Sequence, residues 1–285
     1  MAALPLWLRN TRSVIGLTIL VLVCAAALLA PVIAPHDPNE QDLLNTLLPP
    51  VWADGGDPAF VFGTDSLGRD ILSRLLHGAR VAMTVAISAS FGAMLLGGFL
   101  AHVAGYFGGW ADWLIGRIID VWLSFPPVVL SLILMVGLGS GLWNVILAII
   151  LVDWTRFCRV LRAEVLVVRR RDYVAAARLL GFSHLRTIVR EILPATLPLL
   201  ITLMALEMGI AVVVEAILSF AGMSVGNEVP AWGQMIADAR QDIYTSPSTL
   251  ILPAFAVFIT VFGFNILGDG LRRSLDTRLT QTERA

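Results

Sequence analysis

Two carboxylates lie within one long apolar stretch, and they are the residues with the greatest capacity for chemistry. Glu207 and Glu215 are eight residues apart, which places them about 12 Å apart along a helix axis and on neighbouring faces. An ionisable group inside a membrane segment costs several kcal/mol and marks a functional site by default. Both are therefore candidate contacts for a solute that passes through a helix bundle. The alternative is a structural partner inside the bundle.

The chain lacks the residue patterns that ATP hydrolysis, zinc-dependent proteolysis and metal binding through cysteine require. The chain contains no lysine, so it cannot build the phosphate-binding loop of a Walker-type ATPase. It also lacks the HExxH pattern of a zinc protease. Cys24 and Cys158 lie in or beside different apolar segments, which gives neither a metal-ligand spacing nor a disulfide framework. We predict no catalytic residue, no metal site and no cofactor bound by this chain.

The composition indicates a membrane protein. Of 285 residues, 57% are hydrophobic and only 14% are charged, and the apolar residues form blocks about twenty residues long. The formal net charge is −1, so the broad basic surface of a nucleic-acid-binding protein is absent. We expect membrane lipid as a partner and no nucleic acid.

Apolar blocks and polar intervals predict an all-α membrane protein with six transmembrane helices. The first block is longer than a signal peptide's apolar region and more spans follow it, so an uncleaved helix is favoured over a signal peptide. The six predicted spans are 13–34, 81–104, 113–137, 142–157, 197–220 and 249–267. The chain then divides into a tail, first span and polar segment (1–80), a five-helix core (81–268) and a terminal tail (269–285).

The arginines predict the orientation. Nine lie between Arg156 and Arg190, and others lie in both tails, whereas only four lie in the segments expected outside. Because basic residues concentrate on the cytoplasmic side, both termini should be cytoplasmic. Within the third span, Arg117 and Asp120 are one turn apart, and they should form a structural ion pair.

The polar stretch 169–198 predicts two short helices that meet at a glycine. Asp172 can cap the first helix and Gly181 can end it, while Ser183 can cap a second helix that runs to Leu193 and stops before Pro194. Ala176, Ala177 and Leu180 fall on one small apolar face, which a partner's groove could receive. The alternative is a surface hairpin without a partner.

This stretch resembles the EAA loop in permease subunits of bacterial ATP-binding cassette importers. The match rests on five positions: Ala176, Ala177, Gly181, Leu193 and Pro194. Ala175 stands where that loop has its glutamate, and Glu191 stands where it has an isoleucine. The resemblance implies that the stretch contacts the ATPases through Tyr173, Ala176, Ala177, Arg178, Leu180, Gly181, Leu193 and Pro194.

A second motif resembles one branch of this family. The sequence GTDSLGRD at 63–70 follows the first span, as GTDxxGRD does in the second permease subunit of dipeptide, oligopeptide, glutathione and nickel importers. It leads into an amphipathic helix from Ile71 that Asp65 or Ser66 can cap.

Residues 230–240 predict a short interfacial helix with Trp232 as a membrane anchor.

The resemblance implies a six-helix permease of the type I kind, with a cytoplasmic coupling-helix loop, in the bacterial inner membrane. Its partners would be a second homologous permease, two cytoplasmic ATPase subunits that bind ATP and Mg, and an extracytoplasmic substrate-binding protein. Peptides are the first expectation for the substrate, with nickel or glutathione as alternatives. Two rival readings stay open: an ion-coupled secondary carrier that uses Glu207 and Glu215, and a membrane scaffold.

Overall fold

The computed structural model describes residues 10–226 and 228–275. These residues form helices and no β-strand, and one isolated antiparallel bridge joins Thr64 to Asp70. The all-α expectation is confirmed. The elements are α1 (Thr11–Ile33), α2 (Ile71–Phe107), α3 (Gly109–Leu123), α4 (Pro127–Leu138), α5 (Leu142–Val168), α6 (Asp172–Leu179), α7 (His184–Thr187), the π-helical turn η2 (Ile188–Ile192), α8 (Leu193–Phe220), α9 (Trp232–Asp238), the 3₁₀ turn η3 (Ala239–Gln241) and α10 (Ser248–Leu275).

Four described segments are long and apolar enough to cross a membrane. They are Thr11–Ile33, Ile71–Phe107, His184–Phe220 and Ser248–Ser274. The pair α3 and α4 makes a fifth if it counts as one span, although the two helices meet at 90°. Helix α5, which packs along α2 and carries charged residues in its second half, is not among these candidates, so the described residues supply four or five of the six spans expected.

The predicted third span is wrong as one continuous helix. It breaks between α3 and α4, where Pro126 and Pro127 follow each other. A proline has no N–H to donate and restricts the residue before it, so α3 stops and Pro127 starts a new helix in its first turn.

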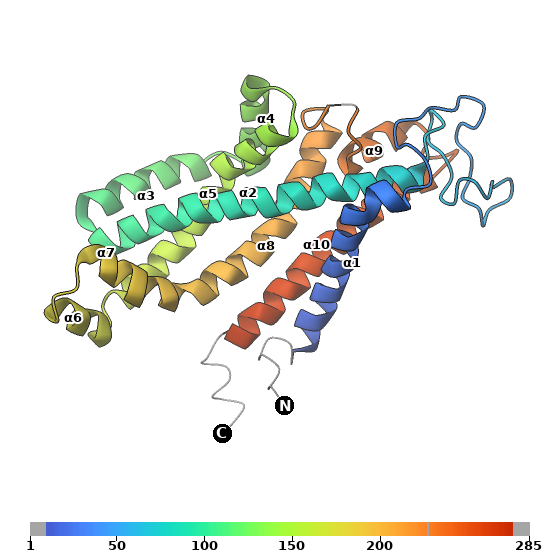
Figure 1. Ribbon diagram of the computed structural model, residues 1–285. Coiled ribbons are helices and arrows are strands. Elements are labelled where there is room, and N and C mark those ends of the chain that lie inside the picture. The colour runs from blue at the N-terminus through green and yellow to red at the C-terminus, as the bar shows by residue number, and fades with distance from the viewer. Residues whose placement is uncertain (1–9, 227, 276–285) are drawn as a thin grey trace, which may run out of the picture.

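Helix α2 is the axis of the molecule, and Figure 1 shows it running along the whole bundle. Its 37 residues make a rod about 55 Å long, whereas a bilayer core is about 30 Å thick. The predicted helix from Ile71 and the predicted span 81–104 are therefore one element. Small residues let α5 approach it: a Cβ on Gly105 would lie 2.6 Å from Cγ1 of Val165.

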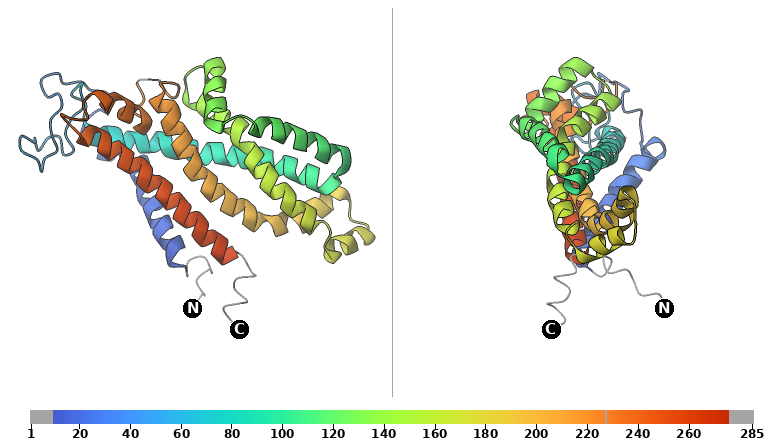
Figure 2. Two further views of the ribbon diagram at one scale, coloured as in Figure 1. Left: turned by 180° about the vertical axis from the view of Figure 1, so that it is seen from behind. Right: turned by 90° about the vertical axis from the view of Figure 1, so that its left-hand side faces the viewer.

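Helices α1 and α10 pack side by side, as the left view of Figure 2 shows. A Cβ on Gly16 would lie 2.6 Å from the backbone nitrogen of Leu267, and a Cβ on Gly263 would lie 2.9 Å from Ile19. Glycines on both helices thus permit the close contact, as is common between membrane helices.

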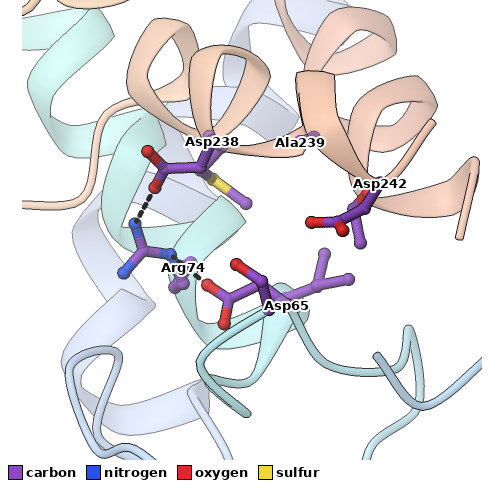
Figure 3. Close-up of a pocket in the computed structure, with 9 residues that line it drawn as sticks. Asp65, Arg74, Asp238, Ala239 and Asp242 are labelled. Atoms are coloured by element: carbon purple, nitrogen blue, oxygen red, sulfur yellow. Dashed lines mark ion pairs between the residues drawn. The ribbon is translucent and has the colours of Figure 1, made fainter. Parts of the chain in front are cut away.

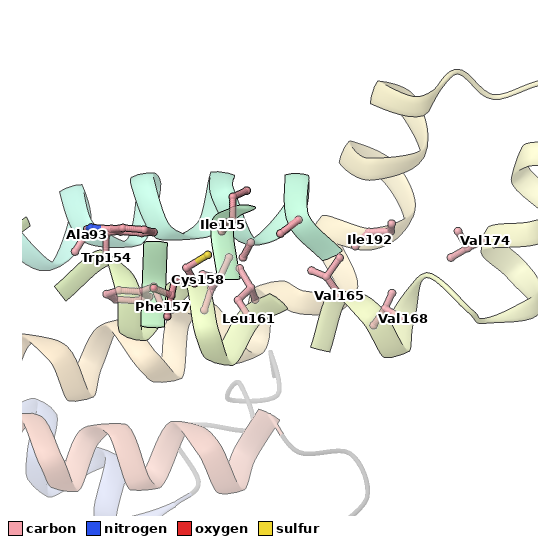
Figure 4. Packing of buried hydrophobic residues seen from close by; sticks show 14 residues of the cluster. Ala93, Ile115, Trp154, Phe157, Cys158, Leu161, Val165, Val168, Val174 and Ile192 are labelled. Carbon is pink, nitrogen blue, oxygen red and sulfur yellow. The ribbon is translucent and has the colours of Figure 1, made fainter. Parts of the chain in front are cut away.

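Three clusters of buried apolar side chains hold the bundle. One joins α2, α3, α5 and α8, and Figure 4 shows its row of side chains from Ala93 to Val174. A second joins α2, α4, α5 and α8, and a third joins α1, α2, α8, α9 and α10. Because α2 and α8 contribute to all three clusters, they bind the α1–α10 pair to the rest of the molecule.

The bundle has two distinct ends. Residues 34–70 and α9 lie at one, which we call the α9 end; the start of α1, the close of α10 and the α6–α7 segment lie at the other, which we call the hairpin end (Figure 1). The long helix α2 spans the distance between the two ends, so the polar segment 34–70 and the α6–α7 segment lie far apart.

Candidate functional site

The polar stretch forms a hairpin of two helices that meet at Gly181, as predicted. The φ of Gly181 is +87°. The N–H of Phe182 donates to the carbonyl of Ala177, and the N–H of Gly181 donates to the carbonyl of Arg178, both at 3.1 Å. This is the Schellman arrangement, in which a glycine with positive φ satisfies the last carbonyls of a helix. Backbone hydrogen bonds and the positive φ fix this short link. Packing does not, since a Cβ on Gly181 would touch nothing within 4 Å.

The caps of the two hairpin helices differ from each other. Ser183 caps α7, because its side chain accepts a hydrogen bond from the N–H of Arg186 at 3.3 Å. The cap predicted at Asp172 is wrong. Arg171 occupies the cap position without a side-chain bond, and Asp172 is the first helical residue. Its carboxylate instead lies near the positive end of the helix dipole.

Side chains of the hairpin fix it to the end of α2. The hydroxyl of Tyr106 lies 2.9 Å from Nδ1 of His184, and Nη2 of Arg178 lies 3.3 Å from Nε2 of the same imidazole. Arg178 also donates to the carbonyl of Phe182 at 2.6 Å. Before the hairpin, Nη1 of Arg169 donates to the carbonyl of Tyr106 at 2.8 Å. Movement of α6 and α7 is thus linked directly to α2.

The exposed surface of the hairpin is apolar, but it is not the face predicted. Ala177 is 6% exposed and packs within its own chain, so its place on an outward face is wrong. Ala176 is exposed, and the large exposed side chains around it are Tyr173, Leu179, Leu180 and Leu185 (45%, 90%, 80% and 72%). The turn of α6 that follows Ala177 carries the leucines outward, and sequence spacing alone did not separate the two faces.

The predicted end of the second helix at Leu193 is also wrong. The chain continues from α7 through the π-helical turn into α8, with Pro194 in the first turn of α8. The N–H of Leu193 donates to Ile188, five residues back. Pro194 has no N–H to donate, and its ring would crowd the carbonyl of the residue four positions earlier. The π-helical turn lies just before Pro194, where the regular α-helical hydrogen bond cannot form. Leu193 packs against the inner apolar cluster, whereas Pro194 is exposed.

Glu207 belongs to a trio of two buried carboxylates and one half-buried arginine. It is 7% exposed, and its Oε2 lies 3.5 Å from Nη1 of Arg156 on α5. Nε of Arg156 lies 3.9 Å from Oδ1 of Asp153, one turn earlier. Sequence reasoning found the glutamate and missed its partners. The signal was present, because Asp153 and Arg156 are three residues apart at the close of an apolar run.

Glu215 has a different setting. It is 1% exposed and accepts hydrogen bonds from the hydroxyls of Ser219 at 2.6 Å and Ser224 at 3.1 Å. Ser219 is one turn further on the same helix, and Ser224 lies in the link that follows it. Glu215 thus holds this link against the end of α8, as the structural alternative for this residue requires. The structure does not bring the two glutamates together.

A charged cluster at the α9 end was not anticipated. Nε of Arg69 lies 2.7 Å from Oδ2 of Asp65, and its Nη2 lies 3.1 Å from Oδ2 of Asp238 on α9. Arg74, which is 1% exposed, lies 3.7 Å from Asp65 and 4.0 Å from Asp238. Figure 3 shows Arg74 between these two carboxylates, with Asp242 across a small pocket. The cluster ties the GTDSLGRD segment to α9.

The caps predicted for α2 are wrong, and the motif acts differently. Asp70 caps the helix, because its carboxylate accepts from the N–H of Ser73 at 2.8 Å. Asp65 instead accepts from the N–H of Leu67 and of Arg69, which closes a tight turn. The motif is therefore a turn that presents Arg69, followed by a cap.

Trp232 is not an anchor at a membrane surface. It is 3% exposed, and its indole N–H donates to the carbonyl of Leu75 at 3.0 Å. Gly78 makes room for the ring, since a Cβ there would lie 2.6 Å from it. The tryptophan thus fixes α9 onto α2, and the anchor prediction fails because the helix packs inward.

Three smaller expectations concern structural residues. Nη1 of Arg117 and Oδ2 of Asp120 lie 3.6 Å apart, so the predicted pair is confirmed. Cys158 is buried and Cys24 is half-buried, and both are free thiols. Among the described residues, no group of three or more His, Cys, Asp or Glu side chains is arranged to hold a metal ion.

Comparison with known proteins covers nearly the whole chain. Residues 70–281 match the family described as "Binding-protein-dependent transport system inner membrane component". Residues 7–50 match the "N-terminal TM domain of oligopeptide transport permease C". The first match alone spans well over half of the chain.

Similar proteins come from several bacteria. The di/tripeptide transport system permease protein DppC of Pseudomonas aeruginosa is 38% identical, over 95% of this chain and 89% of that protein. The dipeptide transport system permease protein DppC of Alkalihalophilus pseudofirmus is 35% identical, over 95% and 87%. The glutathione transport system permease protein GsiD of Pectobacterium atrosepticum is 36% identical, over 93% and 86%. The chain therefore belongs to the family of inner membrane components of binding-protein-dependent transport systems.

Proposed function

We propose that the chain is the permease subunit of an ATP-driven importer and forms, with a second homologous permease, a pathway for di- or oligopeptides. Similar proteins named for dipeptides, di/tripeptides and glutathione support this substrate class. All of these solutes contain peptide linkages and free carboxylates. Glutathione is the alternative that a relative favours, and nickel is an alternative only through the motif at 63–70.

One observation carries the proposal: a hairpin with exposed leucines projects from the bundle beside a concentration of arginines. Leu179 and Leu180 are 90% and 80% exposed, although water-exposed leucines on so short an element gain nothing for the chain itself. Such a surface fits the groove of a protein partner. We assign it to a cytoplasmic ATPase subunit, because energy must come from a protein other than this lysine-free chain.

The complete transporter would contain two permeases, two ATPase subunits that bind ATP and Mg, and a substrate-binding protein outside the membrane. In this arrangement the hairpin end and both termini are cytoplasmic, and the α9 end is extracytoplasmic. The arginine distribution supports the orientation. The contact of Tyr106 with His184 in the hairpin, and that of Arg169 just before the hairpin with the carbonyl of Tyr106, support a direct transfer of ATPase movement to α2.

Reconstituted uptake tests this function. The chain, its second permease and the ATPases are placed in proteoliposomes, and uptake of labelled alanyl-alanine is measured with purified binding protein. We expect uptake that requires both the binding protein and ATP on the hairpin side. Uptake driven by an ion gradient without ATP would instead identify a secondary carrier, and complete absence of uptake with an assembled complex would leave only a scaffold.

A further inference from the structure

Several charged side chains are exposed on the surface that α3 and α5 form. Arg117 and Asp120 on α3 have 65% and 55% of their side chains exposed, and Arg159 on α5 has 57%. Arg156 has 32% exposed. These four residues and Glu207 form what we call the charged strip.

The charged strip is continuous across three helices. Asp120 contacts Arg117 at 3.6 Å and Arg159 of α5 at 3.8 Å. Arg159 follows Arg156 by three residues, so their side chains are neighbours on the helix surface. Arg156 then reaches Glu207 of α8 at 3.5 Å. One polar surface therefore runs from α3 across α5 to α8.

The strip reaches the middle of two helices. Arg156 lies near the midpoint of α5 and Glu207 near the midpoint of α8. A charged side chain at the centre of a membrane costs at least about 2.5 kcal/mol when it faces lipid, and charged residues within membrane helices face a bundle interior or a water-filled cavity. By contrast, exposed positions on α1 such as Leu22 and Leu28 are apolar, as a lipid-facing surface requires.

Arg156 has donors to spare. Among the described residues its guanidinium makes one hydrogen bond, from Nη1 to Glu207 at 3.5 Å, although an arginine carries five N–H donors in a planar fork. A carboxylate is the group that this fork binds with two parallel hydrogen bonds. Asp153 and Glu207 lie 3.9 and 3.5 Å from the fork and offset its charge, which would keep binding of a solute weak enough for release, as conduction requires.

We propose that the charged strip lines the solute pathway and that Arg156 binds the carboxylate of the peptide as it passes the middle of the helix bundle. The inference rests on the proposed function and adds the group that meets the substrate. It makes Glu207 a positioning residue for Arg156, and it excludes burial of the strip against the second permease.

Cysteine labelling tests whether the strip faces water. In the complete transporter in proteoliposomes, with Cys24→Ala as background, Arg156→Cys should react with a membrane-impermeant cationic methanethiosulfonate. With Asp153 and Glu207 left behind, the cationic reagent should react about tenfold faster than the anionic one, because the local potential is negative. Leu22→Cys, at an exposed apolar position in the middle of α1, should not react, and buried Cys158 is the internal control. An unreactive Arg156→Cys in both the resting and the ATP-bound, vanadate-trapped states would place the strip in a protein interface and overturn the proposal.

Uptake measurements test the carboxylate. With saturating binding protein, Arg156→Gln should lower the maximal rate of alanyl-alanine uptake by about tenfold or more, whereas Arg156→Lys should stay within about threefold of wild type, since it keeps the charge. The control is Arg156→Gln combined with Glu207→Gln. If Arg156 only neutralises Glu207, the double variant recovers wild-type uptake, and the proposal is overturned. If Arg156 binds the substrate, the double variant stays as slow as Arg156→Gln. ATPase stimulation by the binding protein reports that each complex is assembled, and failure of the wild type to import alanyl-alanine would instead count against the peptide assignment.

Discussion

At the α9 end, two arginines contact the same two carboxylates with unequal geometry. Arg69 makes close contacts with Asp65 and Asp238, at 2.7 and 3.1 Å. Arg74 is more deeply buried, but its Nε and Nη2 have no hydrogen bond within the described residues. A buried cation with poor partners contributes little, and an apolar side chain of similar volume can replace it. The two positions should therefore respond differently to the same substitution.

We predict that Arg69→Met destabilises the protein by about 2 to 3 kcal/mol, because hydrogen bonds to charged groups contribute about that much. Arg74→Met should change stability by less than about 1 kcal/mol, because the methionine fills the same space without a charge to satisfy. Arg80→Met, on an exposed position of the same helix, is the matched control. The measurement is thermal unfolding of the purified chain in detergent. A larger loss for Arg74 than for Arg69 would contradict the role given to geometry.

Gly181 is the second residue with a sharp expectation. Because its φ is +87° with no contact around the missing side chain, Gly181→Ala should cost about 1 kcal/mol from backbone strain alone. The amide of Phe182 should then exchange hydrogen about fivefold faster, since local opening becomes that much easier. Gly116→Ala, in open space within α3, should show no such increase. Mass spectrometry of exchange across α6 and α7 measures both.

At the scale of elements, apolar block length predicted where most helices lie, and local backbone chemistry decided where they break. The windows for α1 and α8 were correct to within a few residues, and that for α10 was correct at its start, whereas the helix continues eight residues beyond the predicted end at Leu267. The break between α3 and α4 was missed because the apolar block 113–137 has the length of one ordinary span, although it contains the consecutive prolines Pro126 and Pro127. The continuation into α8 was missed for the opposite reason, since Pro194 is accommodated by a π-helical turn that no residue pattern announces.

The hairpin yields a prediction about its outward surface. Leu180→Asp should weaken co-purification of the ATPase subunits at least about tenfold, because a charge enters an apolar contact. Arg170→Asp changes charge nearby on an exposed position outside the two helices and is the matched control. Retention of the ATPases by Leu180→Asp would remove the hairpin from the contact.

Inward-facing hairpin positions should behave differently. Ala177 packs within the chain, so Ala177→Trp should disrupt α6 itself and expose it to proteolysis even without the ATPases. Arg178 is exposed, but Arg178→Ala removes its contacts to Phe182 and His184. The substitution should therefore loosen the same turn as well as remove a surface charge. Protection of the Ala177→Trp hairpin equal to wild type would show that its small inner face is not needed.

For the molecule as a whole, a charged residue could be identified as a functional candidate from the sequence only where it interrupts an apolar run. Glu207 stood out for that reason, whereas Arg156 lay at the edge of its predicted span and looked like part of the basic flank. Pairing across helices depends on how α5 and α8 pack around α2, and the glycines of α2 that meet α5, such as Gly97 and Gly105, are far from it in the sequence. The cluster of Arg69 and Asp238 was hidden in the same way, because its members are far apart in the chain.

The arrangement of the two ends predicts the orientation of the whole molecule. Leu44, in the segment at the α9 end, is 95% exposed, and Arg170, just before α6, is also exposed. With Cys24→Ala as background, we expect Leu44→Cys to react with an impermeant maleimide in intact spheroplasts, and Arg170→Cys to react only after the membrane is opened. The physical reason is the concentration of arginines at the hairpin end, which resist transfer across the membrane. Each variant is first shown to assemble with its second permease. Reaction of Arg170→Cys from outside would place the hairpin away from the cytoplasm, where no ATPase could reach it, and the importer mechanism would fail with it.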